Sequence, residues 1–372
     1  MKYIRVFQSA EQAAAILPTL EYNTLSAIRG ESGISLNPGV VPPPPAPDPT
    51  VPFYIEDVSG SDNTIRIRIS KQNSYASEIQ NTIYKSTDGI TWENAGTTSP
   101  TAVLDIVVPA NSRLYLRCRP RYLKWGDGAN YNQFTDATGN YTIGGNINSL
   151  LYGDTFNGQI EFPNNTANAV FFKLFTSVSG DNTKLVDVSN LLLPATTLVY
   201  RCYTQMFNKC TSLTTAPALP ATTLAQECYM SMFAGCRALT TAPALPATTL
   251  AQECYGSMFS GCYALATAPA LPATTLAQSC YNGMFYGCTA LTTAPELPAT
   301  TLATYCYVSM FNGCTNLNYI KCLATDISAT GCTNYWVSNV AATGTFVKAA
   351  SMSGWPTGTA GIPEGWTVQD AA

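Results

Sequence analysis

The sequence predicts a multidomain protein in which a β-sandwich is followed by an α/β solenoid with a 26-residue period. The 372 residues are enough for two or three separate cores. Residues 53–148 contain short segments in which apolar and polar residues alternate, as in half-buried strands. The motif LPATTL then recurs five times at one fixed interval, with its first leucine at residues 193, 219, 245, 271 and 297. Such a period indicates stacked repeats.

Residues 1–36 are predicted to be an N-terminal anchoring or docking segment. Ser9 and Gln12 have capping-box spacing, and the candidate helix ends at Pro18. A segment of this length cannot form a core of its own. It is therefore either a disordered tail or a peptide that becomes ordered on a partner.

Residues 37–52 are predicted to be a proline-rich linker, because they contain eight prolines. That composition favours a polyproline II spacer of about 3.1 Å per residue. A proline-rich ligand for a signalling domain is the alternative.

Residues 53–148 are predicted to form an immunoglobulin- or fibronectin-like sandwich. Asn63–Ile69 alternates with a period of two. Asp88-Gly89 between two β-rich segments predicts a hairpin. Further strands are expected at Val103–Val108 and Leu114–Cys118, with Pro109, Asn111 and Ser112 as the turn between them.

Residues 193–322 are predicted to be the solenoid, with residues 149–192 as its N-terminal cap and 323–372 as its C-terminal cap. In the unit that starts at Leu219, Cys228 and Met232 belong to a four-residue spacing that predicts a helix with one buried face. A capping box starts this helix at Thr223, and Gly235 ends it. A short strand ended by proline should follow. The phenylalanines Phe233, Phe259 and Phe285 are placed in the core.

The cysteines follow the same period in two columns. Buried free thiols are the favoured interpretation, because both columns adjoin apolar positions. Disulfides are the alternative, although the total of 13 is odd. Metal binding is disfavoured, because eight-residue cysteine spacing without histidine matches no standard zinc pattern. The columns are Cys202, Cys228, Cys254, Cys280 and Cys306, and Cys210, Cys236, Cys262, Cys288 and Cys314.

Adjacent threonines such as Thr222 and Thr223 recur in each repeat and could form an ice-binding array. That array needs both hydroxyls to point outward, which favours residues spaced by two. Helix capping is therefore the preferred interpretation.

The composition argues against several functions. Histidine is absent, which excludes Ser/His and Cys/His nucleophile pairs and imidazole metal sites. No apolar run reaches 18 residues, so no membrane span is expected, and neither is a signal peptide. Six charged residues lie between Leu193 and Asn318, three of each sign, which argues against a nucleic-acid partner. No cofactor is predicted. A glycosidase that works with two carboxylates is a remote alternative.

The pattern MFxGCxxLxxAPxLPATTLAxxCY resembles the BspA-like leucine-rich repeats. The flanks GGNINSLLYGDTF (144–156) and GTFVKAASMSGWPTGTAGIPEGWTV (344–368) resemble companion segments of that group. The resemblance implies a solenoid of the leucine-rich-repeat type. Arrays of such repeats occur in surface adhesins of gut bacteria and in fibres of phages that infect Bacteroidales, including crAss-like ones. MKYIRVFQSAEQAAAIL resembles the virion-anchoring start of a phage fibre.

These observations predict a non-enzymatic structural and adhesion protein. The first hypothesis is a head or tail fibre on a virion surface, assembled in the host cytoplasm. Residues 1–36 would dock into the particle, a trimer would form, and the repeats would bind a host-surface glycan or protein. The second hypothesis is a BspA-like adhesin on a bacterial cell surface.

Columns that vary between repeats indicate where a ligand could bind. A column here is the set of residues at one position of successive repeats. The columns that begin at residues 227, 230, 234 and 237 vary. The last of them accepts arginine, tyrosine and threonine, so it should face solvent. A merely solvated surface is the alternative. The candidate contact residues are Arg237, Tyr263, Tyr286 and Tyr305.

Overall fold

The structure is a computed structural model that describes residues 46–71, 81–99, 102–120, 130–162, 169–178 and 180–371, with only the backbone described at 69–71, 119, 120 and 130. The predicted anchoring segment 1–36 and residues 37–45 of the predicted linker lie outside these ranges. Pro47 to the C-terminus forms one compact unit. The domain boundaries within it remain predictions.

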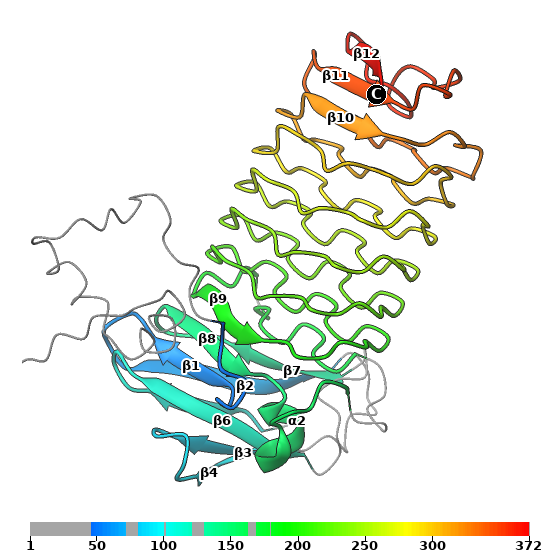
Figure 1. Cartoon of the computed structure of the whole chain (residues 1–372). Coiled ribbons are helices and arrows are strands. Elements are labelled where there is room, and N and C mark those ends of the chain that lie inside the picture. The colour runs from blue at the N-terminus through cyan, green and yellow to red at the C-terminus, as the bar shows by residue number, and fades with distance from the viewer. Residues whose placement is uncertain are drawn as a thin grey trace, which may run out of the picture. The chain divides into compact units, whose positions relative to one another are not determined.

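The described residues form three open sheets (Figure 1). The largest has the order β4-β3-β6-β1-β8-β9, the second β5-β2-β7 and the third β10-β11-β12. The strands are β1 (Tyr54–Asp57), β2 (Asn63–Lys71), β3 (Asn81–Ser86), β4 (Glu93–Thr98), β5 (Leu104–Val108), β6 (Arg113–Pro120), β7 (Asn130–Thr135), β8 (Tyr141–Asn146), β9 (Leu185–Leu192), β10 (Tyr319–Cys322), β11 (Thr345–Lys348) and β12 (Thr367–Asp370). The described helices are α2 (Ser149–Tyr152) and the short 3₁₀ helix η3 (Gly153–Thr155).

The strand predictions for the first part of the chain are confirmed. In β2, Ile65 and Ile67 are fully buried, while Arg66 between them points outward and pairs with Asp105 at 2.8 Å. This alternation is the period-two pattern of a strand with one buried face. β3 and β4 form the predicted antiparallel hairpin around Gly89, although β4 begins at Glu93 rather than Ile90.

The loop of this hairpin is held by one carboxylate. Asp88 Oδ1 accepts hydrogen bonds from the amides of Ile90 and Thr91 at 2.8 and 2.7 Å, and from the hydroxyl of Ser86 at 2.7 Å. The amides of Ile90 and Thr91 are therefore bonded within the loop and cannot pair with β3. The loop is longer than two residues for this reason.

The sheet does not end at residue 148. β9 pairs in parallel with β8 and so extends the largest sheet into the segment predicted to cap the repeats. Phe134 of β7 stacks on Phe175 at 5.5 Å, and Phe175 stacks on Phe207 of the first full repeat at 5.4 Å. Strands and repeats therefore share a continuous core.

The predicted fold class is wrong. No helix is present in the described repeats, and the α/β solenoid of the leucine-rich-repeat type is not formed. Each repeat is a run of tight turns, and the predicted short strands are reduced to isolated bridges such as that between Thr241 and Thr267. The β-rich character of the chain is consistent only with the immunoglobulin-like part of the prediction.

The backbone shows why no helix forms. The amide of Cys228 donates to the Ala225 carbonyl three residues back, at 3.2 Å. The next amide, that of Tyr229, donates to the Cys254 carbonyl of the following repeat at 3.0 Å. The amides alternate in this way along the turns, so half of them hold the turns and half join neighbouring repeats. A helix would use every amide within the segment.

Aromatic rings stack at the same position of successive repeats. The phenylalanine column runs from Phe175 to Phe311 with centroids 5.4 to 5.8 Å apart and nearly parallel planes. The tyrosine column runs from Tyr203 to Tyr307, and Trp336 stacks on its last ring at 6.1 Å. Phe233, Phe259 and Phe285 are fully buried, which confirms their predicted place in the core.

Candidate binding surface

The four predicted contact residues lie at different positions of the repeats. Arg237 and Tyr263 occupy the same column, and the amide that follows Tyr263 donates to the Arg237 carbonyl at 3.2 Å. Tyr263 and Tyr286 are 50% and 49% exposed. The Tyr263 ring lies 3.9 Å from where a Cβ on Gly287 would stand, so it reaches the turn next to Tyr286. Three of the four candidates thus belong to one end of the turns.

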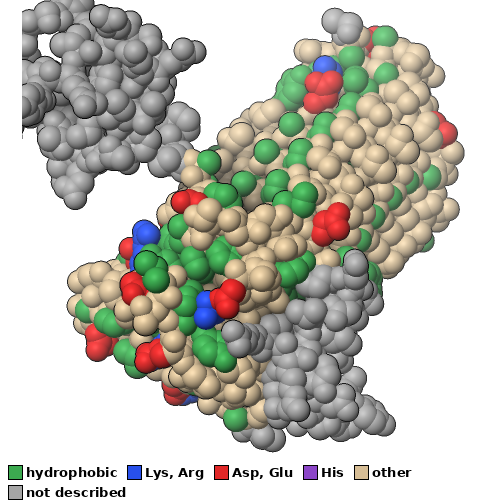
Figure 2. Space-filling view, turned by 60° about the horizontal axis from the view of Figure 1, so that its bottom comes forward, with side chains coloured by type: hydrophobic (Ala, Val, Ile, Leu, Met, Phe, Trp, Pro, Cys, Tyr) green, Lys and Arg blue, Asp and Glu red, His purple; other side chains and the backbone are tan. Residues whose placement is uncertain are grey.

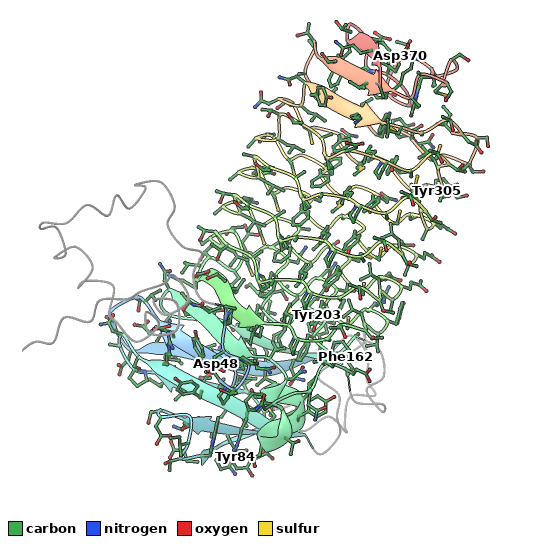
Figure 3. All side chains as sticks on the ribbon, in the orientation of Figure 1. Asp48, Tyr84, Phe162, Tyr203, Tyr305 and Asp370 are labelled. Carbon is green, nitrogen blue, oxygen red and sulfur yellow. The ribbon has the colours of Figure 1, made fainter. Side chains whose placement is uncertain are left out.

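Tyr305, which is labelled in Figure 3, belongs to a different column of the repeats from the other three. Tyr305 lies in the column of Glu227, at the start of the run of turns in its repeat. Tyr263 instead follows the end of the run of turns in its own repeat. Its side chain is 40% exposed, and its ring packs over Gly331 of the next repeat. Arg237 carries an ion pair, because its Nη1 lies 3.4 Å from Asp181 Oδ2.

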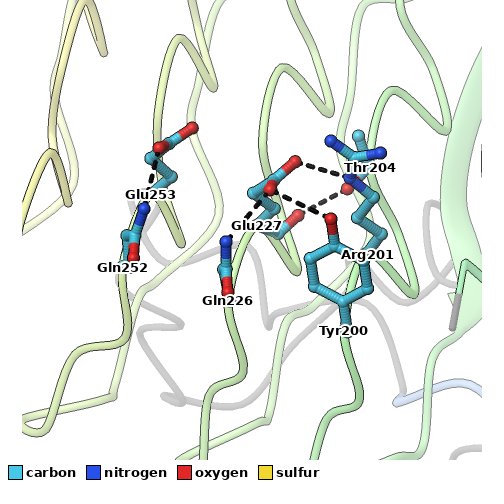
Figure 4. A network of polar contacts seen from close by, with 7 residues as sticks. All are labelled: Tyr200, Arg201, Thr204, Gln226, Glu227, Gln252 and Glu253. Carbon is cyan, nitrogen blue, oxygen red and sulfur yellow. Dashed lines mark hydrogen bonds and ion pairs between the residues drawn. The ribbon is translucent and has the colours of Figure 1, made fainter.

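The column of residue 227 is not uniformly exposed, although its variation predicted exposure. Glu227 and Ser279 are buried, and Glu253 is half-buried. The Glu227 carboxylate is held by Arg201, whose Nε lies 2.5 Å from Oε2 (Figure 4). Oε1 accepts hydrogen bonds from the Tyr200 hydroxyl and from Gln226 Nε2, both at 3.3 Å.

This network is an ordered polar cluster that sequence reasoning missed. The signal was available, because Arg201 and Glu227 are opposite charges one repeat apart in the same column. Burial, together with the Glu227 carboxylate, raises the pKa of the Tyr200 hydroxyl above its ordinary value. The hydroxyl therefore stays protonated and acts as a donor.

The threonine pairs are not helix caps, because no helix follows them. Thr223 forms parallel bridges with Thr197 and Thr249 in the neighbouring repeats. The pairs Thr222–Thr223, Thr248–Thr249 and Thr274–Thr275 are exposed. The preferred interpretation as helix caps is therefore wrong, and both threonines of these pairs are exposed.

All thirteen cysteines are buried and free, which confirms the interpretation as buried thiols. In one column each thiol faces a carbonyl of the preceding repeat. The Sγ atoms of Cys236, Cys262 and Cys288 lie 3.1, 3.2 and 3.1 Å from the carbonyl oxygens of Phe207, Phe233 and Phe259. Burial raises the pKa of these thiols well above the ordinary range, so they remain protonated.

Much of the exposed face of the repeats is uncharged (Figure 2). Among the described residues, no group of three or more histidine, cysteine, aspartate or glutamate side chains could hold a metal ion. Within the same ranges no helix has the length and apolar character that a membrane crossing requires.

These features describe a mainly uncharged surface on which a few tyrosines and an arginine project from an otherwise repetitive stack. Comparisons with protein-family models, with curated proteins and with solved structures give no match.

Proposed function

We propose that this chain is a non-enzymatic structural and adhesion protein of a phage virion, a head or tail fibre that displays its repeats to a host surface. The observation that carries the proposal is the contrast between a repeated core and a varied surface. The buried positions keep the same cysteine, tyrosine, methionine and phenylalanine in successive repeats. The exposed column of Arg237 carries arginine, tyrosine, threonine and threonine.

A packed, repetitive stack suits adhesion because an ordered backbone reduces the conformational entropy that is lost on binding. Tyrosine and arginine are among the residues that contribute most at protein interfaces. A surface with few charges suits neutral polar ligands, such as a surface glycan or an exposed segment of a host protein.

The resemblance to BspA-like repeats supports both a virion fibre and a bacterial surface adhesin. The resemblance of residues 1–17 to the start of a phage fibre favours the virion. Anchoring by residues 1–36 and assembly into a trimer belong to this proposal, and a trimer would multiply weak contacts through avidity.

The proposal is tested by binding the purified full chain to candidate Bacteroidales host cells, and by probing purified particles and host envelopes with an antibody. We expect saturable binding to cells and a signal on particles. Tyr263→Ala with Tyr286→Ala should weaken the binding, while the control Tyr335→Ala, an exposed tyrosine outside the predicted set, should not. A signal only in the envelope of uninfected bacteria would favour the adhesin instead.

A further inference from the structure

A polar pocket of about 340 Å³ lies between β7 and the first turns of the repeats. Its lining includes Tyr131 of β7 and Lys173 in the turns that precede the first full repeat. Gln205, Asn208 and Lys209 of the first full repeat line it as well. Its volume falls in the range of small-molecule sites, roughly 300 to 1,000 Å³.

The pocket is positively charged. Among the residues that the structure describes, two lysines and no carboxylate line it. Within the described ranges neither lysine forms an ion pair. Asp181, which follows the lining residue Gly180 in the sequence, pairs with Arg237. Unpaired ammonium groups that share a concave site favour an anionic ligand.

The lysines occupy backbone positions that lysine disfavours. Lys209 has φ of 60°, and the same column in the following repeats is glycine, with φ of 70° to 78° at Gly235, Gly261, Gly287 and Gly313. Lys173 has φ of 53°, in the column that continues through Gln205 and Ser231. The left-handed conformation itself belongs to the repeat architecture, because residues such as Glu253 and Ser257 in later repeats adopt it too. The architecture does not require lysine at either position, because later repeats carry glutamine, serine or glycine in the Lys173 column and glycine in the Lys209 column.

Three further lining residues, Tyr131, Gln205 and Asn208, offer the groups that bind a sugar ring. Lys173 Nζ lies 5.5 Å from the centroid of the Tyr131 ring, so an anion held by this ammonium would lie close to an aromatic ring. Aromatic side chains at binding sites combine an apolar ring with a polar tip. The side-chain amides of Gln205 and Asn208 have no protein partner among the described residues, so they are available for ligand hydroxyls.

We propose that this pocket binds a carboxylated sugar, a uronic acid residue of a surface polysaccharide. Lys173 and Lys209 hold the carboxylate, Tyr131 contacts the ring, and Gln205 and Asn208 bond its hydroxyls. The inference rests on the proposed adhesive function only for the source of the sugar, since the ligand class follows from the pocket itself.

The test is titration of the purified full chain with D-glucuronic acid, D-glucose and inorganic phosphate, followed by calorimetry or NMR. We expect glucuronic acid to bind, and glucose and phosphate to bind at least tenfold more weakly. Lys209→Gly and Lys173→Ser should each weaken glucuronic acid roughly tenfold to hundredfold, the usual effect of losing a hydrogen bond to a charged group.

Two controls keep the test decisive. Lys209→Gly installs the residue that later repeats carry in this column, so its thermal midpoint should be unchanged or higher. Lys184→Ser removes a lysine outside the pocket and should leave binding unchanged. Absent binding of glucuronic acid, equal binding of phosphate, or unchanged affinity in both pocket variants would overturn the proposal. These measurements use free sugar, so they are independent of whether the chain attaches to particles or cells.

Discussion

At the scale of single residues, the repeats depend on backbone positions in the left-handed region. In one repeat Glu253, Ser257 and Gly261 have φ of 55°, 52° and 71°, so every fourth residue adopts this conformation. A residue with a Cβ pays about 1–2 kcal/mol there. Glycine recurs at the last of the three positions, which removes that strain where the run of turns ends.

Gly261→Ala should therefore lower the free energy of unfolding by about 1–2 kcal/mol. A Cβ at this position would lie 3.7 Å from Gly235, an ordinary contact, so backbone strain alone produces the effect. The matched control is Ser257→Gly, which relaxes a strained residue and should not reduce stability. Urea unfolding measures both, and equal losses in the two variants would contradict the assignment.

At the scale of elements, the stacked aromatic columns replace the helices that the sequence predicted. Phe259 stacks between Phe233 and Phe285, at 5.8 Å from each. Each ring contacts only the repeats on either side, so the stability of the array should be mainly a nearest-neighbour property.

Phe259→Ala should cost about 3–5 kcal/mol, because it leaves a cavity in a fully buried column. Native-state hydrogen exchange should show the loss of protection chiefly in the repeats that contain Phe233 and Phe285. The exposed Tyr263→Ala is the control and should change stability by at most about 0.5 kcal/mol. An equal rise of exchange in β2 and β5 would show that the damage spreads beyond the neighbouring repeats.

At the scale of the whole molecule, the core contains many groups that must remain protonated. Burial raises the pKa of Cys202 and Cys254 from 9.0 to about 12. It also raises the pKa of the stacked hydroxyls of Tyr203 and Tyr229. These groups are neutral when protonated, so the folded state favours the protonated form.

Stability should consequently fall on the alkaline side. Below pH 9.0 the folded and unfolded chains both keep their thiol protons, and this contribution is fully present. Between pH 9 and about 12 the unfolded chain ionises while the folded chain does not, so the contribution is lost as pH rises through the folded pKa. Urea midpoints measured from pH 7 to pH 11 should be level at first and then decline. A flat profile to pH 11 would show that the thiols are accessible.

The proposed anchor is also a property of the whole chain. Pro47 onward forms a compact unit, so deletion of residues 1–36 should leave a folded, soluble protein. The same deletion should abolish incorporation into particles, as measured by copurification with virions. Normal incorporation of the shortened chain would refute the anchoring role.

Much of the strand structure was predictable, because alternation and turn residues act locally. β2 follows from the period-two pattern of Asn63–Ile69, and the hairpin follows from Asp88-Gly89. The parallel pairing of β8 with β9 was not predictable, because about 40 residues separate the two strands. The candidate surface was found in part: the exposure of Tyr263 and Tyr286 follows from variation between repeats, whereas the burial of Glu227 depends on its pairing with Arg201. The pocket between β7 and the turns joins segments that no local pattern connects.

The sequence by itself determined the period, the composition of the core and the burial of its cysteines and aromatics. Tertiary structure decided the conformation of each repeat. A spacing of four residues, as in Cys228, Met232 and Cys236, is shared by one face of a helix and by successive four-residue turns. The difference lies in where the intervening amides donate, and half of them donate to the next repeat. These acceptor carbonyls are present only when a neighbouring repeat is stacked alongside. The stacking of repeats therefore favours turns over a helix.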